Sequence, residues 1–434
     1  MNLATQVRKL WSAFDGLAGD TLWSIAHDGS TLLTALISFS LLQRSLEVSQ
    51  YGSYVAAYGM LGTLGALSFS GVGLALLQRI IGERDDAQVS LNSFLSLSML
   101  LGAAGGVVAV MFGPRFVELN QLEIFLLVIG ELLGAGVIFV LAMGVQASFG
   151  FAAATRLKLG VIYIRLVSVV VLFAVGGLSV LTLAASFCFL FLSYALYLML
   201  VHLPKSGYRV DFCRPGRETT DASLMFSVPM GASRLQTDGD KFLLGAFGFL
   251  DAAGLYGAAY RVIMIGITPL MALDTAAFQR YLPKVEGQPG VHWRRAKTLG
   301  TLTFVASLFV VGGIYLFLPL FEWALLTGDY KEAGSLVPWL LVIIPLIATI
   351  NAPMNGLLGL GLVRVRMFIY LGSAALSLAL YLILIPFYDW RGAAVATIIS
   401  EVVLSVVAWT VLWKAQQAAD KEIKAQGEVI PAIS

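Results

Sequence analysis

The sequence predicts an all-α polytopic membrane protein, with twelve transmembrane helices arranged as two six-helix bundles. Of its 434 residues, 58% are hydrophobic and only 12% are charged, whereas a soluble globular domain carries about 25% charged residues. The mean hydropathy is +0.85. Twelve apolar stretches are long enough to cross a bilayer, and the basic residues fall mainly on alternate connections between them.

A membrane-spanning helix needs about 20 predominantly apolar residues. The connections between the apolar stretches are short, so no segment remains for a soluble domain. The predicted spans are 22–43, 53–78, 91–113, 122–146, 158–176, 179–201, 223–247, 254–278, 298–319, 335–359, 365–386 and 392–413.

The segment before the first span has apolar residues at helical spacing with Arg8 and Lys9 between them, which is typical of an interfacial amphipathic helix. A basic hydrophilic stretch separates the sixth span from the seventh. The predicted organisation is an interfacial helix (1–20), an N-terminal six-helix bundle (21–203), a basic linker (204–221), a C-terminal six-helix bundle (222–414) and a tail (415–434).

Basic residues set the predicted orientation. If the N-terminus is cytoplasmic, 21 of the 28 Lys and Arg residues lie on the inner side, counting Arg165 near the inner end of its span. Four lie outside and three lie within spans. Because cytoplasmic connections carry the excess of Lys and Arg, this asymmetry predicts that both termini are cytoplasmic.

An internal repeat supports the division into two bundles. The segment 52–58 (GSYVAAY) matches the segment 254–260 (GLYGAAY) at a constant offset of 202 residues. Both segments open an even-numbered span on its outer side. Six spans per repeat bring both repeats into the membrane in the same sense, so we expect them to be related by an axis along the membrane normal, with a cavity between them.

The seventh span carries four ionisable residues. Arg234, Asp238 and Lys241 are spaced i, i+4, i+7 and share one helix face, whereas Asp240 points elsewhere. Arg261 follows in the next span. Each such charge costs about 2.5–3.5 kcal/mol at the bilayer centre. We expect a cationic cavity wall in which Arg234, Lys241 and Arg261 bind an anionic headgroup. The alternative is that Asp238 and Asp240 neutralise the cations as packed ion pairs.

Four further carboxylates fall within predicted spans. Such groups are candidates for proton or sodium coupling, because a carboxyl in a low dielectric can titrate near neutral pH. The alternative for each is a neutral, hydrogen-bonded carboxyl between helices. Glu131 is the strongest candidate because it lies farthest from a span end. The candidates are Asp28, Glu131, Asp274 and Glu401.

Several classes of function lack a sequence signal. The three histidines are far apart, so we expect no metal site, and we expect no cofactor. Cys188 and Cys213 lie in different kinds of segment and are expected to be unpaired thiols. The phosphate-binding motif of ATPases is absent. The net charge of +2 gives no indication of a nucleic-acid partner.

Taken together, several segments resemble one family. The segments 240–245 (DKFLLG) and 253–261 (AGLYGAAYR) are similar to the seventh and eighth spans of bacterial lipid-linked oligosaccharide flippases of the Wzx, or polysaccharide transport, type. The segment 50–54 (QYGSY) resembles their first-half counterpart, and 392–401 (GAAVATIISE) resembles the start of their last span.

This resemblance implies the fold of the MOP superfamily, which includes the MATE transporters: two six-helix bundles around a central cavity. It implies a flippase rather than an enzyme, which moves an undecaprenyl-diphosphate-linked glycan to the outer leaflet of the bacterial cytoplasmic membrane by alternating access. The implied partners are that glycan lipid and the bilayer, with the glycan polymerase and glycosyltransferases of the same pathway as candidate protein partners. Cavity-lining cations are a feature of such flippases.

Three alternatives remain. A drug exporter of the MATE branch predicts a binding site dominated by acids. A lipid II flippase usually has two more spans. A membrane glycan polymerase or ligase predicts a large outer loop with catalytic residues, but the longest outer connection here is 320–334.

Overall fold

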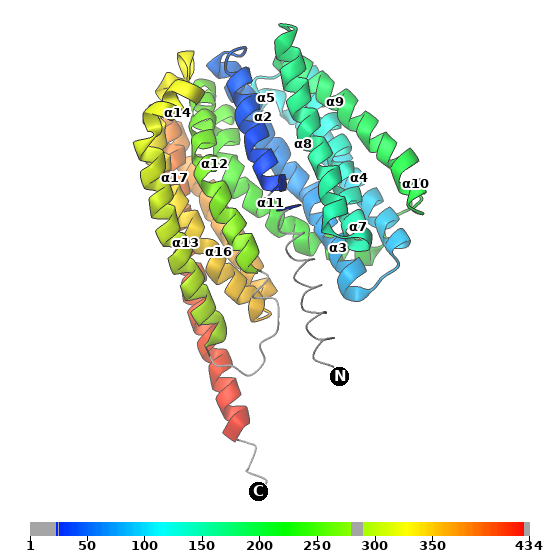
Figure 1. Cartoon of the computed structure of the whole chain (residues 1–434), viewed down its shortest axis with the longest axis vertical. Coiled ribbons are helices and arrows are strands. Elements are labelled where there is room, and N and C mark those ends of the chain that lie inside the picture. The colour runs from blue at the N-terminus through cyan, green and yellow to red at the C-terminus, as the bar shows by residue number, and fades with distance from the viewer. Residues whose placement is uncertain (1–22, 25, 279–289, 429–434) are drawn as a thin grey trace, which may run out of the picture. The chain divides into compact units, whose positions relative to one another are not determined.

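The structure is a computed structural model that describes residues 23, 24, 26–278 and 290–428. The predicted interfacial helix at 1–20 lies outside the described residues. Throughout the described part of the chain, every regular element is helical (Figure 1). The first described helix runs over 26–42.

The helices group into two compact units, Met1–Gly257 and Ala258–Ser434. The division falls inside α12 (Leu250–Phe278) rather than in the predicted linker. The seventh predicted span, α11 (Arg217–Ala246), packs on α2 (Val48–Gly65) and so belongs to the first unit. The predicted bundle boundaries rest on the apolar spans and the basic linker, and they stay a prediction.

In the first unit, several spans contain wide π-helical turns between α-helical segments. Helices α8 (Phe151–Ala174) and α9 (Val180–Tyr197) lie side by side (Figure 1). The remaining elements of this unit are η1 (Ala66–Ser70), α3 (Gly71–Gln78), η2 (Arg79–Glu83), α4 (Ala87–Phe112), α5 (Pro114–Val117), α6 (Gln121–Val128), η3 (Ile129–Ala135), α7 (Gly136–Phe149), α8 (Phe151–Ala174), α9 (Val180–Tyr197), η4 (Leu198–His202) and α10 (Leu203–Lys205).

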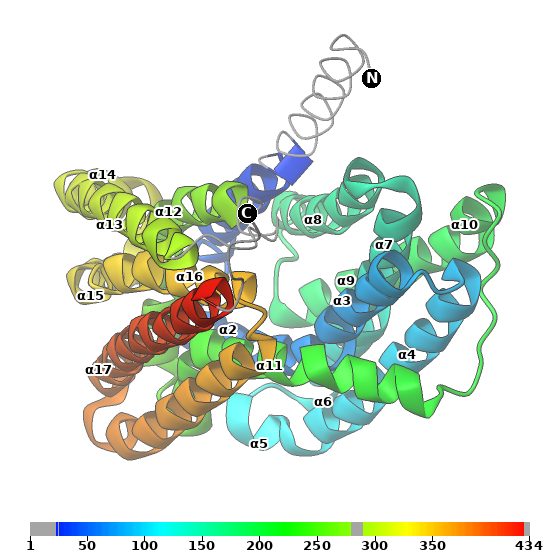
Figure 2. The ribbon, with the colours of Figure 1, turned by 90° about the horizontal axis from the view of Figure 1, so that it is seen from below.

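In the second unit, α16 (Ile343–Gly359) packs against both α13 (Val291–Leu316) and α17 (Val363–Glu428) (Figure 2). The long helix α17 contains one residue with non-helical backbone angles, Asp389, at φ 49° and ψ −127°. This break separates the segments predicted as the last two spans. The elements after α12 are α13 (Val291–Leu316), α14 (Leu318–Leu325), η5 (Gly328–Glu332), α15 (Ala333–Leu340), α16 (Ile343–Gly359) and α17 (Val363–Glu428).

The described helices are consistent with twelve spans. Among the described residues, eight helices are long and apolar enough to cross a membrane, or nine if the bent pair Gly328–Leu340 and Ile343–Gly359 forms one span. One of the eight is α17, which covers two predicted spans. The helix at 26–42 and the highly charged α11 account for the other two.

Local signals in the sequence fix where several helices begin. The Asp86 carboxylate accepts a hydrogen bond from the backbone N–H of Val89 at 2.9 Å, which caps α4. Asn120 and Glu123 form a reciprocal capping box at the start of α6. Gly150, at φ 87°, reverses the chain between α7 and α8 in a conformation that only glycine adopts easily.

The N-terminal ends of α2 and α12 meet at two glycines. A Cβ atom added to Gly52 would lie 1.9 Å from the carbonyl oxygen of Leu250, and one added to Gly254 would lie 2.3 Å from that of Val48. Both positions therefore require glycine. The repeat offset relates Gly52 to Gly254 and also Val48 to Leu250, so the two contacts are equivalent under the repeat.

A third contact joins two positions that are equivalent to each other under the repeat. An added Cβ at Gly257 would lie 3.0 Å from a methyl carbon of Val55, and these two positions correspond under the same offset. A reciprocal pair of contacts together with a self-equivalent contact is what a two-fold axis produces. We term this set of contacts, between 48–55 and 250–257, the repeat crossing.

Candidate functional site

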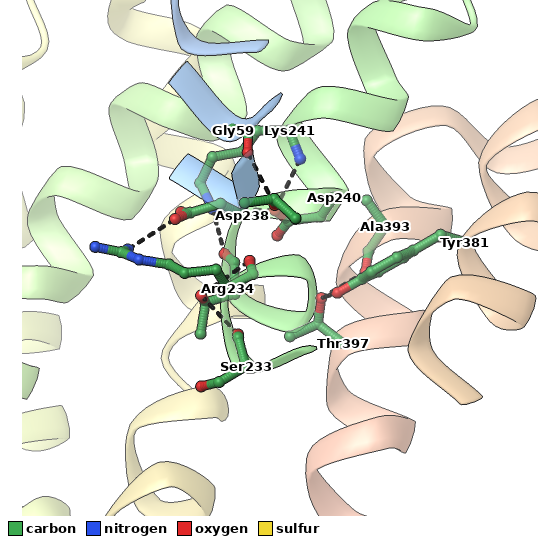
Figure 3. Close-up of polar contacts among 11 residues, drawn as sticks. Gly59, Ser233, Arg234, Asp238, Asp240, Lys241, Tyr381, Ala393 and Thr397 are labelled. Atoms are coloured by element: carbon green, nitrogen blue, oxygen red, sulfur yellow. Dashed lines mark hydrogen bonds and ion pairs between the residues drawn. The ribbon is translucent and has the colours of Figure 1, made fainter. Parts of the chain in front are cut away.

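The four ionisable residues of the seventh predicted span lie together on α11 (Figure 3). Arg234 donates a hydrogen bond from Nη1 to Oδ2 of Asp238 at 2.8 Å, one helical turn further along. The Arg234 side chain is 55% exposed. Within the described part of the chain, Asp238 is its one ion-pair partner. Most of its donor groups therefore point away from this pair.

Lys241, by contrast, is buried among acceptors. Its Nζ lies 3.0 Å from Oδ1 of Asp240 and 3.5 Å from Oδ1 of Asp238. It also donates to the carbonyl oxygen of Thr237 at 2.8 Å. Only 6% of Lys241 and 1% of Asp240 is exposed. This geometry is the packed ion pair that the sequence left open as an alternative.

The charge cluster on α11 is formally neutral, because two carboxylates face two cations. Removing one partner of a buried pair leaves an uncompensated charge, which is strongly unfavourable. Lys241 and Asp240 therefore stabilise one another. Arg234 is the accessible cation of the cluster, and its planar guanidinium suits phosphate oxygens in a bidentate arrangement.

Small residues hold α11 close to α2 and α3. An added Cβ at Gly59 would lie 2.6 Å from the carbonyl oxygen of Asp238, and one at Gly71 would lie 2.2 Å from the Cα atom of Ser227. Glycine at such positions lets helix backbones approach, as is usual between helices in membranes. Because of this packing, the side of α11 that carries Asp238 faces α2.

Arg261 is the third predicted cation and belongs to the second unit. It is half-buried and makes contacts of its own.

Glu131 is held in a second charged group within the first unit. Its Oε1 accepts a hydrogen bond from the Tyr58 hydroxyl at 2.6 Å, and its Oε2 pairs with the Arg165 guanidinium. Arg165 Nη1 also donates to the Tyr58 hydroxyl at 3.1 Å. The sequence singled out Glu131 but missed both partners.

The prediction that Arg165 lies near the cytoplasmic end of its span is wrong. Arg165 lies past the midpoint of α8 and pairs with a buried carboxylate. Its spacing from Lys158, at i and i+7 on one helix face, was the signal that this span carries a polar stripe.

The other three candidate carboxylates lie in separate places. Asp28 pairs with the neighbouring His27 at 3.1 Å, and its side chain is 38% exposed. Asp274 is 4% exposed and accepts a hydrogen bond from Asn351 at 2.9 Å. Glu401 is 5% exposed. Among the described residues, no group of three or more His, Cys, Asp or Glu could hold a metal ion.

Comparisons with known proteins address the family and the fold. A family model described as polysaccharide biosynthesis protein matches residues 17–278. No curated protein matched the sequence. An inward-facing MATE family multidrug resistance transporter of the MOP superfamily is similar in structure, with a TM-score of 0.67, 17% identity, and coverage of 89% of this chain and 96% of that one.

Two further solved structures are similar. The MATE multidrug transporter DinF-BH has a TM-score of 0.65 and 16% identity, covering 92% of this chain and 95% of that one. A MOP superfamily transporter from Pyrococcus furiosus, whose binding pocket is described as having reverse polarity, has a TM-score of 0.61 and 16% identity, covering 92% and 96%. These identities establish the fold alone, and they confirm the predicted all-helical MOP fold of a multi-pass membrane protein.

Proposed function

Because the chain belongs to the polysaccharide biosynthesis protein family, we propose that it flips a polyprenyl-diphosphate-linked oligosaccharide from the inner to the outer leaflet of the bacterial cytoplasmic membrane. The family and the fold are those of membrane transporters. In the proposed cycle the diphosphate and sugars enter a polar site by alternating access, while the prenyl tail stays in lipid.

The exposed guanidinium of Arg234 is the observation that carries this proposal. A cation in a membrane-spanning helix carries a large free-energy penalty, so such a residue usually has a ligand or an oppositely charged partner. Asp238 occupies one edge of the guanidinium at 2.8 Å. Among the described residues its remaining N–H groups have no ion-pair partner, and they can receive an anionic headgroup, for which a diphosphate is well suited.

Lys241 has a different role in this proposal. Its ammonium group is already occupied by Asp240 and by the backbone, so it positions α11 rather than grips the headgroup. Arg261 remains a proposed headgroup ligand of the second unit. Proton or sodium coupling through Glu131, Asp28, Asp274 or Glu401 stays a prediction from the sequence.

Substitution of Arg234 tests the proposal. We expect Arg234→Ala to lower flipping of a labelled prenyl-diphosphate glycan by tenfold or more in proteoliposomes, since one charge-assisted interaction contributes about 1.5–3 kcal/mol. Protein abundance and thermal stability should stay at wild-type levels, because this side chain is exposed.

Arg217→Ala is the matched control. Arg217 lies on the same helix and also pairs with an aspartate at i+4, Asp221, but its side chain is 95% exposed. Unchanged flipping by the Arg234 variant would contradict the headgroup role. Transport of cationic drugs in place of the glycan lipid would instead indicate an exporter of the MATE branch.

A further inference from the structure

Glu131, Tyr58 and Arg165 form a closed hydrogen-bonded triad that joins three elements of the first unit. The Tyr58 hydroxyl of α2 donates to Glu131 Oε1 at 2.6 Å and accepts from Arg165 Nη1 at 3.1 Å. The other guanidinium nitrogen, Nη2, pairs with Glu131 Oε2. Each residue of the triad thus forms a hydrogen bond with both of the others.

The guanidinium of Arg165 lies among aromatic rings. Its central carbon is 5.6 Å from the ring centroid of Tyr58, 5.6 Å from that of Phe187 and 5.2 Å from that of Phe191. Such rings stabilise a cation and exclude water. The Arg165 side chain is nevertheless 30% exposed, whereas that of Glu131 is 10% exposed. The cation is therefore accessible and the acid is covered.

The backbone around Glu131 is unusual. Glu131 lies in η3, a π-helical segment of seven residues, and wide turns of this kind are frequent at functional sites. Gly130 and Gly134 bring η3 against α9, because added Cβ atoms there would lie 2.9 Å from the backbone nitrogen of Cys188 and 2.7 Å from Cβ of Phe191. Glu131 consequently faces α2 and α8 rather than α9.

Few other titratable groups surround Glu131. Among the described residues, Tyr54 and Tyr58 of α2 and Arg165 of α8 act on the triad electrostatically. Helix α9 adds Cys188, Tyr194 and Tyr197, and α6 adds Glu123, which caps its own helix. Helices α4 and α7 contain no ionisable residue. Arg165 is thus the sole cation paired with Glu131 in the described structure.

We propose that Arg165 is a second binding site for the diphosphate group and that a proton on Glu131 releases Arg165 for this ligand. The inference rests on the proposed function, because that function supplies a diphosphate. Carboxylate and phosphate compete for the same edge of a guanidinium. A covered carboxylate that loses its cation is strongly unfavourable unless it becomes neutral. Binding of the anion at Arg165 is therefore accompanied by the uptake of one proton from the solvent by the Glu131 carboxylate.

The hydrogen bonds of the triad accommodate both states. With Glu131 ionised, the Tyr58 hydroxyl donates to it. With Glu131 protonated, the carboxyl O–H donates to the Tyr58 oxygen, and the Tyr58 O–H turns to donate to the bound anion. The proton thus remains on Glu131, while the Tyr58 O–H, which donated to the acid before, now donates to the ligand.

Proton uptake on binding tests this switch. Farnesyl diphosphate is titrated into the full-length protein in nanodiscs by calorimetry, in two buffers of different ionisation enthalpy at one pH. If Glu131 is ionised before the ligand binds, we expect the wild-type protein to take up about one proton for each ligand bound. Glu131→Gln should take up none and should bind about tenfold more tightly, because the competing carboxylate is gone.

The Arg165 variants separate binding from folding. Arg165→Gln should bind about tenfold more weakly and should be less stable, since it leaves Glu131 without its cation. The double variant E131Q/R165Q has neither charge, so we expect near wild-type thermal stability with weak binding and no proton uptake. Arg156→Gln is the control on the same helix, because Arg156 stacks on Trp23 at 5.1 Å instead of joining the triad.

The outcomes distinguish the two proposals. Two outcomes would overturn the proposed switch without contradicting the proposed flippase function. One is that Glu131→Gln takes up as many protons per ligand as the wild-type protein. The other is that the double variant E131Q/R165Q binds the ligand as tightly as Glu131→Gln does. Failure of both the wild-type protein and Glu131→Gln to bind farnesyl diphosphate would overturn the proposed function. Inorganic diphosphate at higher concentration should cause the same proton uptake, and uptake that requires the prenyl chain would overturn the assignment of the headgroup as the ligand.

Discussion

Arg234 and Lys241 lie on one face of α11, but their side chains are 55% and 8% exposed, respectively. The difference follows from their partners. Lys241 meets Asp240 and a backbone carbonyl, whereas Arg234 meets a single aspartate oxygen. Two cations of one helix face are thereby divided between a structural role and a proposed ligand-binding role.

The pairing of Lys241 predicts a loss of stability. Lys241→Met leaves the 1%-exposed Asp240 carboxylate without its cation, and breaking such a pair costs about 3–5 kcal/mol. We expect a clear fall in the thermal unfolding temperature of the purified protein. The double variant D240N/K241M should recover most of it, because both charges are gone. Wild-type stability of Lys241→Met would mean that the ion pair contributes nothing.

At the residue scale, the sequence predicts which charges are present but not which ones pair. The positions of Arg234, Asp238 and Lys241 on one helix face follow from helical spacing, and the structure keeps them together. Arg165 could not be paired with Glu131, because its partners come from positions 34 and 107 residues away. Such contacts depend on how helices pack, which hydropathy does not encode.

Individual helices follow the hydropathy of the sequence closely. The span predicted at 91–113 corresponds to α4 at Ala87–Phe112. Their internal irregularities were not predictable, such as the π-helical turn at Ile129–Ala135 or the 47° bend between the segments that end at Leu340 and begin at Ile343. A window average over apolar residues does not report a wide turn or a bend.

Close packing of α11 on α3 gives a prediction at the element scale. Gly71→Ala places a Cβ 2.2 Å from the Cα atom of Ser227, which is backbone and cannot rotate away. We expect this overpacking to cost about 1–3 kcal/mol of stability. Gly372→Ala is the control: it has no neighbouring atom within 4 Å and lies in α17, so it should stabilise by about 0.5–1 kcal/mol. Equal unfolding temperatures for the two variants would contradict the close contact.

At the scale of the whole molecule, the sequence repeat predicts two halves related by an axis along the membrane normal, which stays a prediction. The contacts of the repeat crossing lie within the first unit and follow the same offset of 202 residues. The grouping of α11 with the first unit was not predictable, because the repeat assigns this span to the second half. Contact between helices, rather than repeat membership, determines which helices form a compact unit.

The repeat crossing also gives a test of alternating access. The position of an added Cβ at Gly257 is 3.6 Å from Cβ of Val55, which lies within the range for a disulfide. In a background without Cys188 and Cys213, we expect V55C/G257C to cross-link on oxidation. If this end of α2 separates from α12 during transport, cross-linking should stop flipping, and a reductant should restore it. Full flipping by the oxidised protein would show that this contact stays closed throughout the cycle.

The repeat crossing has the form of a homodimer interface held within one chain. A side chain on Gly52 would meet a carbonyl oxygen of the second repeat, and a side chain on Gly254 would meet the corresponding oxygen of the first. At a self-complementary patch between two copies of one chain, a single glycine would satisfy both restrictions. Within this one chain the restriction applies at two positions, so the same geometry requires both glycines.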